Sequence, residues 1–254
     1  MKQKNIIFDI TGVLFKEHKL KLLRKIGVKR IARYITRHRT SPLAFCFKTL
    51  DVIKEREQQL LGTVDTTPFI YKKRALPSCT ADWQKGLITN AELLHILEEH
   101  LNALSHEGYF TSRQEEQLAL RILHTMLNAE QLLAVSRPIK RTINLVKKLR
   151  QRGEYKLFVL SNMGHEPFRL LKKNYPEVFT LFDDCIISAD VRAIKPDLAI
   201  FTHLLKKYQL TAQSCIFIDD QEENVLAARQ LGMEAIMFDR LPRVRRRLKK
   251  LQIL

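Results

Sequence analysis

The chain has 254 residues, 45% of them hydrophobic, which is enough apolar content for a buried core and argues against a disordered protein. No apolar run approaches the roughly 18 residues that a transmembrane helix requires, and Asp9 lies where a signal peptide would be apolar, so we expect a cytoplasmic protein with no transmembrane segment. The net charge is +17, and the four cysteines show no spacing typical of zinc or redox sites.

The first predicted element is a short buried strand that ends on a carboxylate. Residues 6–8 are apolar, Asp9 follows them, and Gly12 marks a turn. In a parallel sheet, a side chain just past the carboxyl end of a strand points into the ligand site. Asp9 is therefore either a functional carboxylate or an ordinary turn residue, and this stretch alone does not distinguish the two.

Residues 16–40 carry ten Lys and Arg and one acid, with apolar residues at helical spacing, which predicts two helices broken near Gly27. Residues 240–254 carry seven more basic residues and no acid, so the two segments hold +16 of the total charge. These basic residues have two interpretations. They are either the solvated faces of helices or a surface that binds an anionic partner, such as a phosphorylated substrate, nucleic acid or an acidic membrane surface.

Residues 40–136 show helical periodicity, notably over 91–103 and 114–133, and no convincing run of strands, which predicts a helical module. Beyond it, Pro138 is expected to open a helix that ends at Gly153. Predicted strands at 156–160, 185–188, 215–218 and 234–238 then alternate with helices through 168–173, 197–208 and 223–231. This alternation predicts an α/β fold with a parallel sheet covered by helices on both faces.

Polar residues accompany the ends of these strands. In chain order they are Asp9, Thr11, Ser161, Asn162, Lys195, Asp219 and Asp220. Each alone is typical of a turn. Together, three carboxylates would repel one another unless a divalent cation neutralised them, and carboxylate oxygens suit Mg²⁺. With Ser161 and Lys195 available to an anion, the set predicts a phosphoryl-transfer site in which Asp9 attacks in line and forms an aspartyl-phosphate.

The segments that hold these residues resemble motifs of the haloacid dehalogenase (HAD) superfamily: FDITGVLF, VLSNM, IKPDLAIF and FIDDQEENVLAARQLGM. The resemblance covers residues 5–15 and 138–239 and is greatest to the helical-cap branch near sugar-phosphate phosphatases. It implies a three-layer Rossmann-like core, residues 1–15 and 137–254, with an all-α cap, residues 16–136, inserted after the first strand. It also implies a magnesium-dependent phosphatase or phosphotransferase acting on a small phosphate ester.

The same resemblance implies a role for each polar residue. Asp9 resembles the nucleophile, and the implied Mg²⁺ ligands are Asp9, the backbone carbonyl of Thr11, Asp219 and Asp220. The implied phosphate contacts are Ser161, Asn162 and Lys195, and Asn224 matches a supporting position in the fourth motif.

Thr11 departs from the pattern of the family. Its phosphatases usually carry a second Asp at this position, which protonates the leaving group and then activates the hydrolytic water. A hydroxyl titrates too high to exchange protons near neutral pH, so a general acid–base contribution of about 10²- to 10⁴-fold should be missing. Cation-pumping ATPases resemble this Asp-x-Thr arrangement and form a long-lived aspartyl-phosphate. We therefore expect slow turnover.

Two alternative functions remain at this stage. A catalytically impaired HAD-fold protein would bind nucleic acid or an acidic surface through its basic segments, although no motif that reads nucleic acid accompanies them. A haloacid dehalogenase would also lack the second acid, but dehalogenases do not need magnesium or paired acids. The pair Asp219 and Asp220 therefore favours phosphate over haloacid.

Overall fold

The computed structural model describes residues 4–61, 69–71 and 73–254. Its centre is a five-stranded parallel sheet in the order β7-β6-β1-β8-β9. The strands are β1 (Lys4–Phe8), β6 (Tyr155–Ser161), β7 (Asp184–Ile187), β8 (Cys215–Asp219) and β9 (Glu234–Met237). Because β1 lies between two neighbouring strands and is covered by helices on both faces, its residues 6–8 are all apolar and fully buried.

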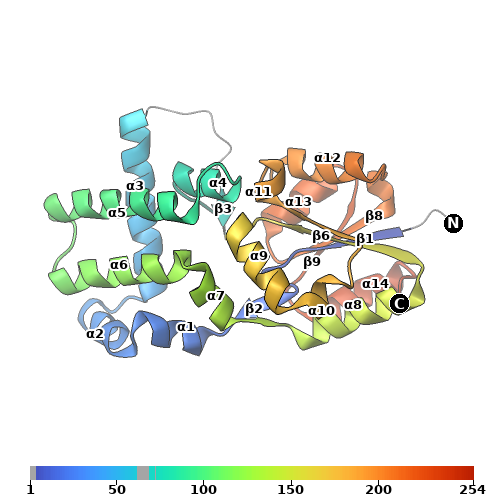
Figure 1. Cartoon of the computed structure of the whole chain (residues 1–254), viewed down its shortest axis with the longest axis horizontal. Helices are drawn as coiled ribbons and strands as arrows, with labels where there is room; N and C mark the ends of the chain where they lie inside the picture. The colour runs from blue at the N-terminus through green and yellow to red at the C-terminus, as the bar shows by residue number, and fades with distance from the viewer. Residues whose placement is uncertain (1–3, 62–68, 72) are drawn as a thin grey trace.

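Helices cover both faces of this sheet (Figure 1). One face packs against α8 (Lys140–Arg152), α9 (His165–Asn174), α10 (Pro176–Phe179) and α14 (Leu241–Lys250). The other packs against α12 (Leu198–Lys207) and α13 (Glu222–Gln230). Ile6 and Phe8 belong to the first core and Ile7 to the second, as the alternation of a strand requires. The predicted three-layer α/β core is confirmed.

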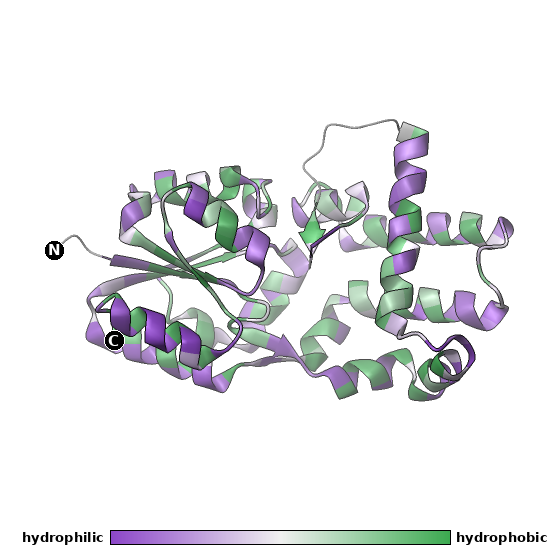
Figure 2. Ribbon diagram, turned by 180° about the vertical axis from the view of Figure 1, so that it is seen from behind, coloured by the Kyte–Doolittle hydropathy of each residue, from purple (hydrophilic) through white to green (hydrophobic). Residues whose placement is uncertain are grey.

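The basic C-terminal segment is a core helix. Val244 and Leu248 of α14 are fully buried against the sheet, while its arginines lie on the outer face, which is strongly hydrophilic in Figure 2. Arg247 forms an ion pair with Glu234 of β9, with Nε and Oε1 2.9 Å apart. This arrangement supports the solvated-face interpretation of residues 240–254.

The predicted helix start at Pro138 is wrong. Pro138 is the last residue of β5 (Ser136–Pro138), which pairs antiparallel with β2 (Phe15–Glu17), and α8 begins two residues later. A proline at the end of an edge strand has no ladder donor to lose, so the pairing tolerates it. The two strands carry the chain from the core into the helical module and back.

The described residues between 19 and 135 form mainly helices around a core of their own, which includes Ile53, Leu93 and Leu118. The helices are α1 (Lys19–Ile26), α2 (Val28–His38), α3 (Pro42–Leu61), α4 (Ser78–Gln84), α5 (Asn90–His106), α6 (Arg113–Leu127) and α7 (Ala129–Val135). Two short strands, β3 (Ile70–Tyr71) and β4 (Arg74–Ala75), interrupt them. We refer to α1–α7 with β3 and β4 as the cap; the domain limits at residues 16 and 136 stay a prediction.

The break at Gly27 is confirmed, because α1 ends at Ile26 and α2 begins at Val28. The periodic stretch 114–133 is instead two helices, separated at Asn128, whose side chain accepts a hydrogen bond from the Gln131 amide and caps α7. Among the helices of the described residues, none is both long and apolar enough to cross a membrane.

Candidate active site

The candidate site lies where β1, β6 and β8 end, at the edge of the sheet that faces the cap in Figure 1. Asp9 is the residue after β1, and its amide donates to the carbonyl of Ile218 at 3.0 Å. Ser161 and Asp219 are the last residues of β6 and β8, whereas the sequence predicted that they follow their strands. Parallel pairing thus brings residues more than 200 positions apart to one edge.

Lys195 joins these strand ends. It is 1% exposed, and its Nζ donates to Asp9 Oδ1 at 2.7 Å, Asp219 Oδ2 at 2.6 Å and the Leu160 carbonyl at 2.9 Å. Burial alone would lower the pKa of Lys195, but the carboxylates of Asp219 and Asp9 outweigh it and raise the pKa. The ammonium group therefore stays charged and has all three of its protons bonded.

Asn162 holds this lysine in place. Its Nδ2 donates to the Lys195 carbonyl at 2.8 Å, and its Oδ1 accepts from the Lys195 amide at 2.8 Å. The sequence-based expectation was a phosphate contact, but the side chain in the structure bonds to the backbone of Lys195. Asn162 is thus placed to position the lysine.

The three acids predicted for a metal site form a tight group. Carboxylate oxygens of Asp9, Asp219 and Asp220 all lie within 4.8 Å of one another. Burial raises the pKa of Asp9 to about 6, with Lys195 opposing the rise and Asp219 adding to it. Burial and repulsion from Asp9 and Asp219 raise the pKa of Asp220 to about 7. A cluster of carboxylates that resists full ionisation fits a hard divalent cation, which favours the charged forms.

Besides Lys195, two further donors orient Asp219 within this group. Asn224 Nδ2, fully buried at the start of α13, lies 3.1 Å from each oxygen of Asp219, and the Gln221 amide donates to Oδ1 at 2.8 Å. Asn224 was predicted to support the site from the fourth motif. Gln221 was missed, because a main-chain amide leaves no signal in a pattern of side chains.

The remaining predicted residues differ in their surroundings. Ser161 is 1% exposed, and its hydroxyl beside the Asp9 carboxylate opposes the rise in the pKa of Asp9. Thr11 is exposed in the turn that follows β1. The acids, Lys195 and Ser161 therefore lie close together at the strand ends. The side chain of Thr11 is exposed to solvent.

The family model for haloacid dehalogenase-like hydrolases matches residues 3–232. This chain belongs to that family. It is therefore a HAD-like hydrolase, as its motifs indicated, and the structural neighbours below share its fold.

Among curated proteins, the HAD-like hydrolase is 31% identical over 127 residues to a drimenol cyclase of Aspergillus calidoustus, covering 50% of this chain and 24% of that protein. It is 35% identical over 97 residues to a sesquiterpene phosphatase of Aspergillus oryzae, covering 38% of this chain and 48% of the relative. The chain thus matches about a quarter of the length of the first relative and about half of the second.

Among solved structures, a HAD family enzyme of Bacteroides thetaiotaomicron is similar with a TM-score of 0.56 and 20% identity, over 93% of this chain and 94% of that one. A predicted HAD-like family hydrolase of Porphyromonas gingivalis has a TM-score of 0.55 and 17% identity, over 98% and 99%. At these identities the likeness shows a shared fold.

Gly12 of the hydrolase lies against the acid cluster. Its φ is +86°, and a Cβ at this position would come within 2.2 Å of Asp220 Oδ2. We expect Gly12→Ala to push the Asp220 carboxylate out of the cluster and to strain the backbone by about 1–2 kcal/mol. The rate of hydrolysis by the Gly12→Ala variant should therefore fall sharply below that of wild type.

Gly153→Ala is the matched control for Gly12→Ala. Gly153 has φ +69°, and no atom lies within 4 Å of the place that a Cβ would take, so it shares the strain without the contact. Urea unfolding and hydrolysis rates of both variants test the expectation. Equal hydrolysis rates in the two variants would show that a Cβ at position 12 does not disturb the Asp220 carboxylate.

The cap touches the hydrolase core beside the site. Ser188 begins the short helix α11 (Ser188–Val191), and its hydroxyl donates to the Gln84 carbonyl of α4 at 2.6 Å while accepting from the Met163 amide at 2.9 Å. Phe69 and Ala81 of the cap pack on Ile194, next to Lys195. Lys73 also reaches Glu222 of α13, with Nζ and Oε2 2.6 Å apart. Three contacts thus seat the cap over the strand ends.

Ser188→Ala tests the strength of that seating. The variant leaves the Gln84 carbonyl and the Met163 amide without their partner, and Ser188 is fully buried, so we expect unfolding free energy to fall by about 1–3 kcal/mol. Ser105→Ala, at a half-buried position of α5, is the control and should change stability little. Denaturant unfolding measures both, and equal stability of the two variants would contradict the expectation.

Proposed function

We propose that this hydrolase is a magnesium-dependent phosphatase or phosphotransferase that acts in the cytoplasm on a small phosphate ester, through an aspartyl-phosphate on Asp9. The observation that carries the proposal is the setting of Asp9, with Oδ1 bonded to Lys195 and the acids Asp219 and Asp220 alongside. A structural neighbour from B. thetaiotaomicron was solved with magnesium and inorganic phosphate, and one curated relative is a phosphatase. Both support the proposal.

The first chemical step forms a bond between a carboxylate oxygen of Asp9 and phosphorus and breaks the bond between phosphorus and the ester oxygen. Lys195 binds Oδ1, which orients the Asp9 carboxylate for attack. The alcohol departs with a proton taken from solvent, and water then attacks the aspartyl-phosphate and releases phosphate. Lys195 and Ser161 supply positive charge and a donor to the phosphoryl oxygens.

Asp9, Asp219, Asp220 and the Thr11 carbonyl would hold Mg²⁺, which would offset the negative charge of the carboxylates and of the incoming phosphate. The rest of the site is built by the chain itself, because Asn224 and the Gln221 amide orient Asp219 and Asn162 orients Lys195. Thr11 provides no proton carrier, so both steps should be slow.

The name of the A. oryzae relative makes an apolar phosphate ester one candidate class of substrate. The cap adds limited support, since Phe69 and Ala81 pack on Ile194 directly beside Lys195. A sesquiterpenyl phosphate therefore belongs in a substrate panel with an aryl phosphate and a sugar phosphate.

The alternatives receive less support. The ion pair of Arg247 and the burial of Val244 and Leu248 make the C-terminal basic segment part of the core, and none of the comparisons points to nucleic acid. One similar solved structure is a dehalogenase, with 13% identity and a TM-score of 0.55, which speaks to fold alone. Halide release from a haloacid without added metal would favour that alternative.

The direct test is hydrolysis of the substrate panel by the purified chain with Mg²⁺, then with EDTA, then with Mg²⁺ restored. We expect phosphate release that EDTA abolishes and Mg²⁺ recovers, because the acid cluster would then lack its counter-ion. Phosphate release that EDTA leaves unchanged would contradict the metal assignment. No release from any member of the panel would contradict the proposed activity.

A further inference from the structure

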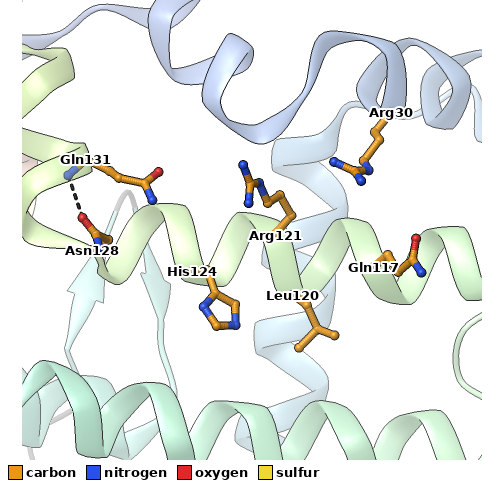
Figure 3. Close-up of a pocket in the computed structure, with 7 residues that line it drawn as sticks. All are labelled: Arg30, Gln117, Leu120, Arg121, His124, Asn128 and Gln131. Atoms are coloured by element: carbon orange, nitrogen blue, oxygen red, sulfur yellow. Dashed lines mark hydrogen bonds between the residues drawn. The ribbon is translucent and has the colours of Figure 1, made fainter.

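An open pocket of about 480 Å³, here called the cavity, lies on the surface of the cap, and most of the side chains that line it are exposed. Its lining comes from α2, α6 and the start of α7, and includes no residue of the core. Figure 3 shows Arg30 of α2 and Arg121 of α6 extending into the gap between their helices. A ligand at this place would stay in contact with solvent, so charge rather than burial would have to hold it.

The lining of this cavity holds cationic and neutral polar side chains and no acidic one. Arg30, Arg121 and His124 line it with the amides of Gln117, Asn128 and Gln131, and no acid is among the lining residues. Within the part of the chain that the structure describes, neither arginine forms an ion pair, and His124 pairs with Glu98 of α5. The Nε of Arg121 donates a hydrogen bond to the Lys25 carbonyl.

The surroundings increase the positive charge. A narrow groove adjoins the cavity, shares Arg30 and Gln117 with it, and adds Arg33, Arg37 and His38. Its one acid, Glu115, is buried and accepts from the amide and hydroxyl of Thr111. Helices α1 and α2 contain no acid at all. Several exposed guanidinium groups on one surface, with no acid on α1 or α2, raise the local positive potential and attract anions.

We propose that this cavity is a second anion site, which binds a phosphate-bearing ligand between Arg30 and Arg121. Planar guanidinium groups donate paired hydrogen bonds to phosphate oxygens, and the amides of Gln117, Asn128 and Gln131 add neutral donors. Arg33 and Arg37 extend the site along α2, so a ligand with several phosphate groups should bind more tightly than orthophosphate. The site does not depend on the chemistry proposed at Asp9.

The test is calorimetric titration of the full chain with inorganic tripolyphosphate in EDTA, so that metal-dependent turnover does not contribute. We expect one saturable site, weakened about tenfold or more in the double variant Arg30→Gln/Arg121→Gln. The matched control is Arg245→Gln/Arg246→Gln, which removes the same charge from exposed positions of α14 and should leave the affinity unchanged.

Three results would overturn the proposal: no saturable binding, equal weakening by both double variants, or binding that the cap variant leaves intact. A second arm identifies the source of the phosphate, by sedimentation with phosphatidylcholine vesicles that contain phosphatidic acid. Vesicle binding that requires Arg30 and Arg121 assigns the site to a lipid headgroup. Tripolyphosphate binding without vesicle binding assigns it to a soluble ligand.

Discussion

Asp9→Asn should reduce phosphate release by at least about 10³-fold, because the amide oxygen is a poor nucleophile and cannot form the acyl phosphate. The substitution keeps the shape of the side chain, and Lys195 retains Asp219 and the Leu160 carbonyl as acceptors. The fold should therefore survive, so the loss would reflect chemistry. Initial rates with saturating Mg²⁺ and an aryl phosphate measure the effect.

The control for Asp9→Asn is Asp239→Asn. Asp239 is an exposed acid that follows β9 and forms an ion pair with Arg243. This variant removes the same charge from the surface and should retain wild-type rates. If Asp9→Asn also retained its activity, Asp9 would not be the nucleophile, and the site would need another attacking group.

Thr11→Asp should increase turnover by about 10²- to 10⁴-fold, the range of a positioned general acid and base. Thr11 is exposed beside Asp9, so a carboxylate fits there without burying a charge. The new acid would protonate the leaving alcohol and then accept a proton from the attacking water. Steady-state rates over a range of pH measure the gain, which should appear with a new ionisation in the profile.

Thr11→Asn separates proton transfer from side-chain shape in this experiment. Asn has the size of Asp but does not exchange a proton near neutral pH, so its rate should remain near that of wild type. A gain in both variants would indicate a packing effect. No gain in Thr11→Asp would mean that the proton carrier is not what limits this enzyme.

The candidate site was predictable because its members follow local rules. Asp9, Ser161 and Asp219 each adjoin an apolar run of strand length, and parallel strands bring their carboxyl ends to one edge. Lys195 does not directly follow a strand, and its role in the site was predicted from its resemblance to the third motif. Its three bonds to Asp9, Asp219 and Leu160 show why the fold brings it there.

Other features depend on partners distant in the chain and gave no local signal. Ser188 and Gln84 are 104 residues apart and meet only when the cap packs on the core. Pro138 satisfies the local rule for a helix start, but its pairing with Phe15 makes it a strand end. Helix α3 lies within the predicted helical module, but its bounds were not predicted. Its contacts come from distant parts of the cap: Ile53 is in the cap core, and Glu57 accepts from the Ser78 amide.

The account as a whole depends on a covalent intermediate at Asp9, and trapping that intermediate is its most direct test. The chain would be mixed with Mg²⁺ and an excess of a substrate that it hydrolyses, quenched in acid, digested and examined by mass spectrometry. We predict one added phosphoryl group on the peptide that contains Asp9. It should accumulate in wild type, because Thr11 cannot activate water, and less in Thr11→Asp. Turnover with no phosphoryl group on that peptide, in wild type or in Thr11→Asp, would contradict the account.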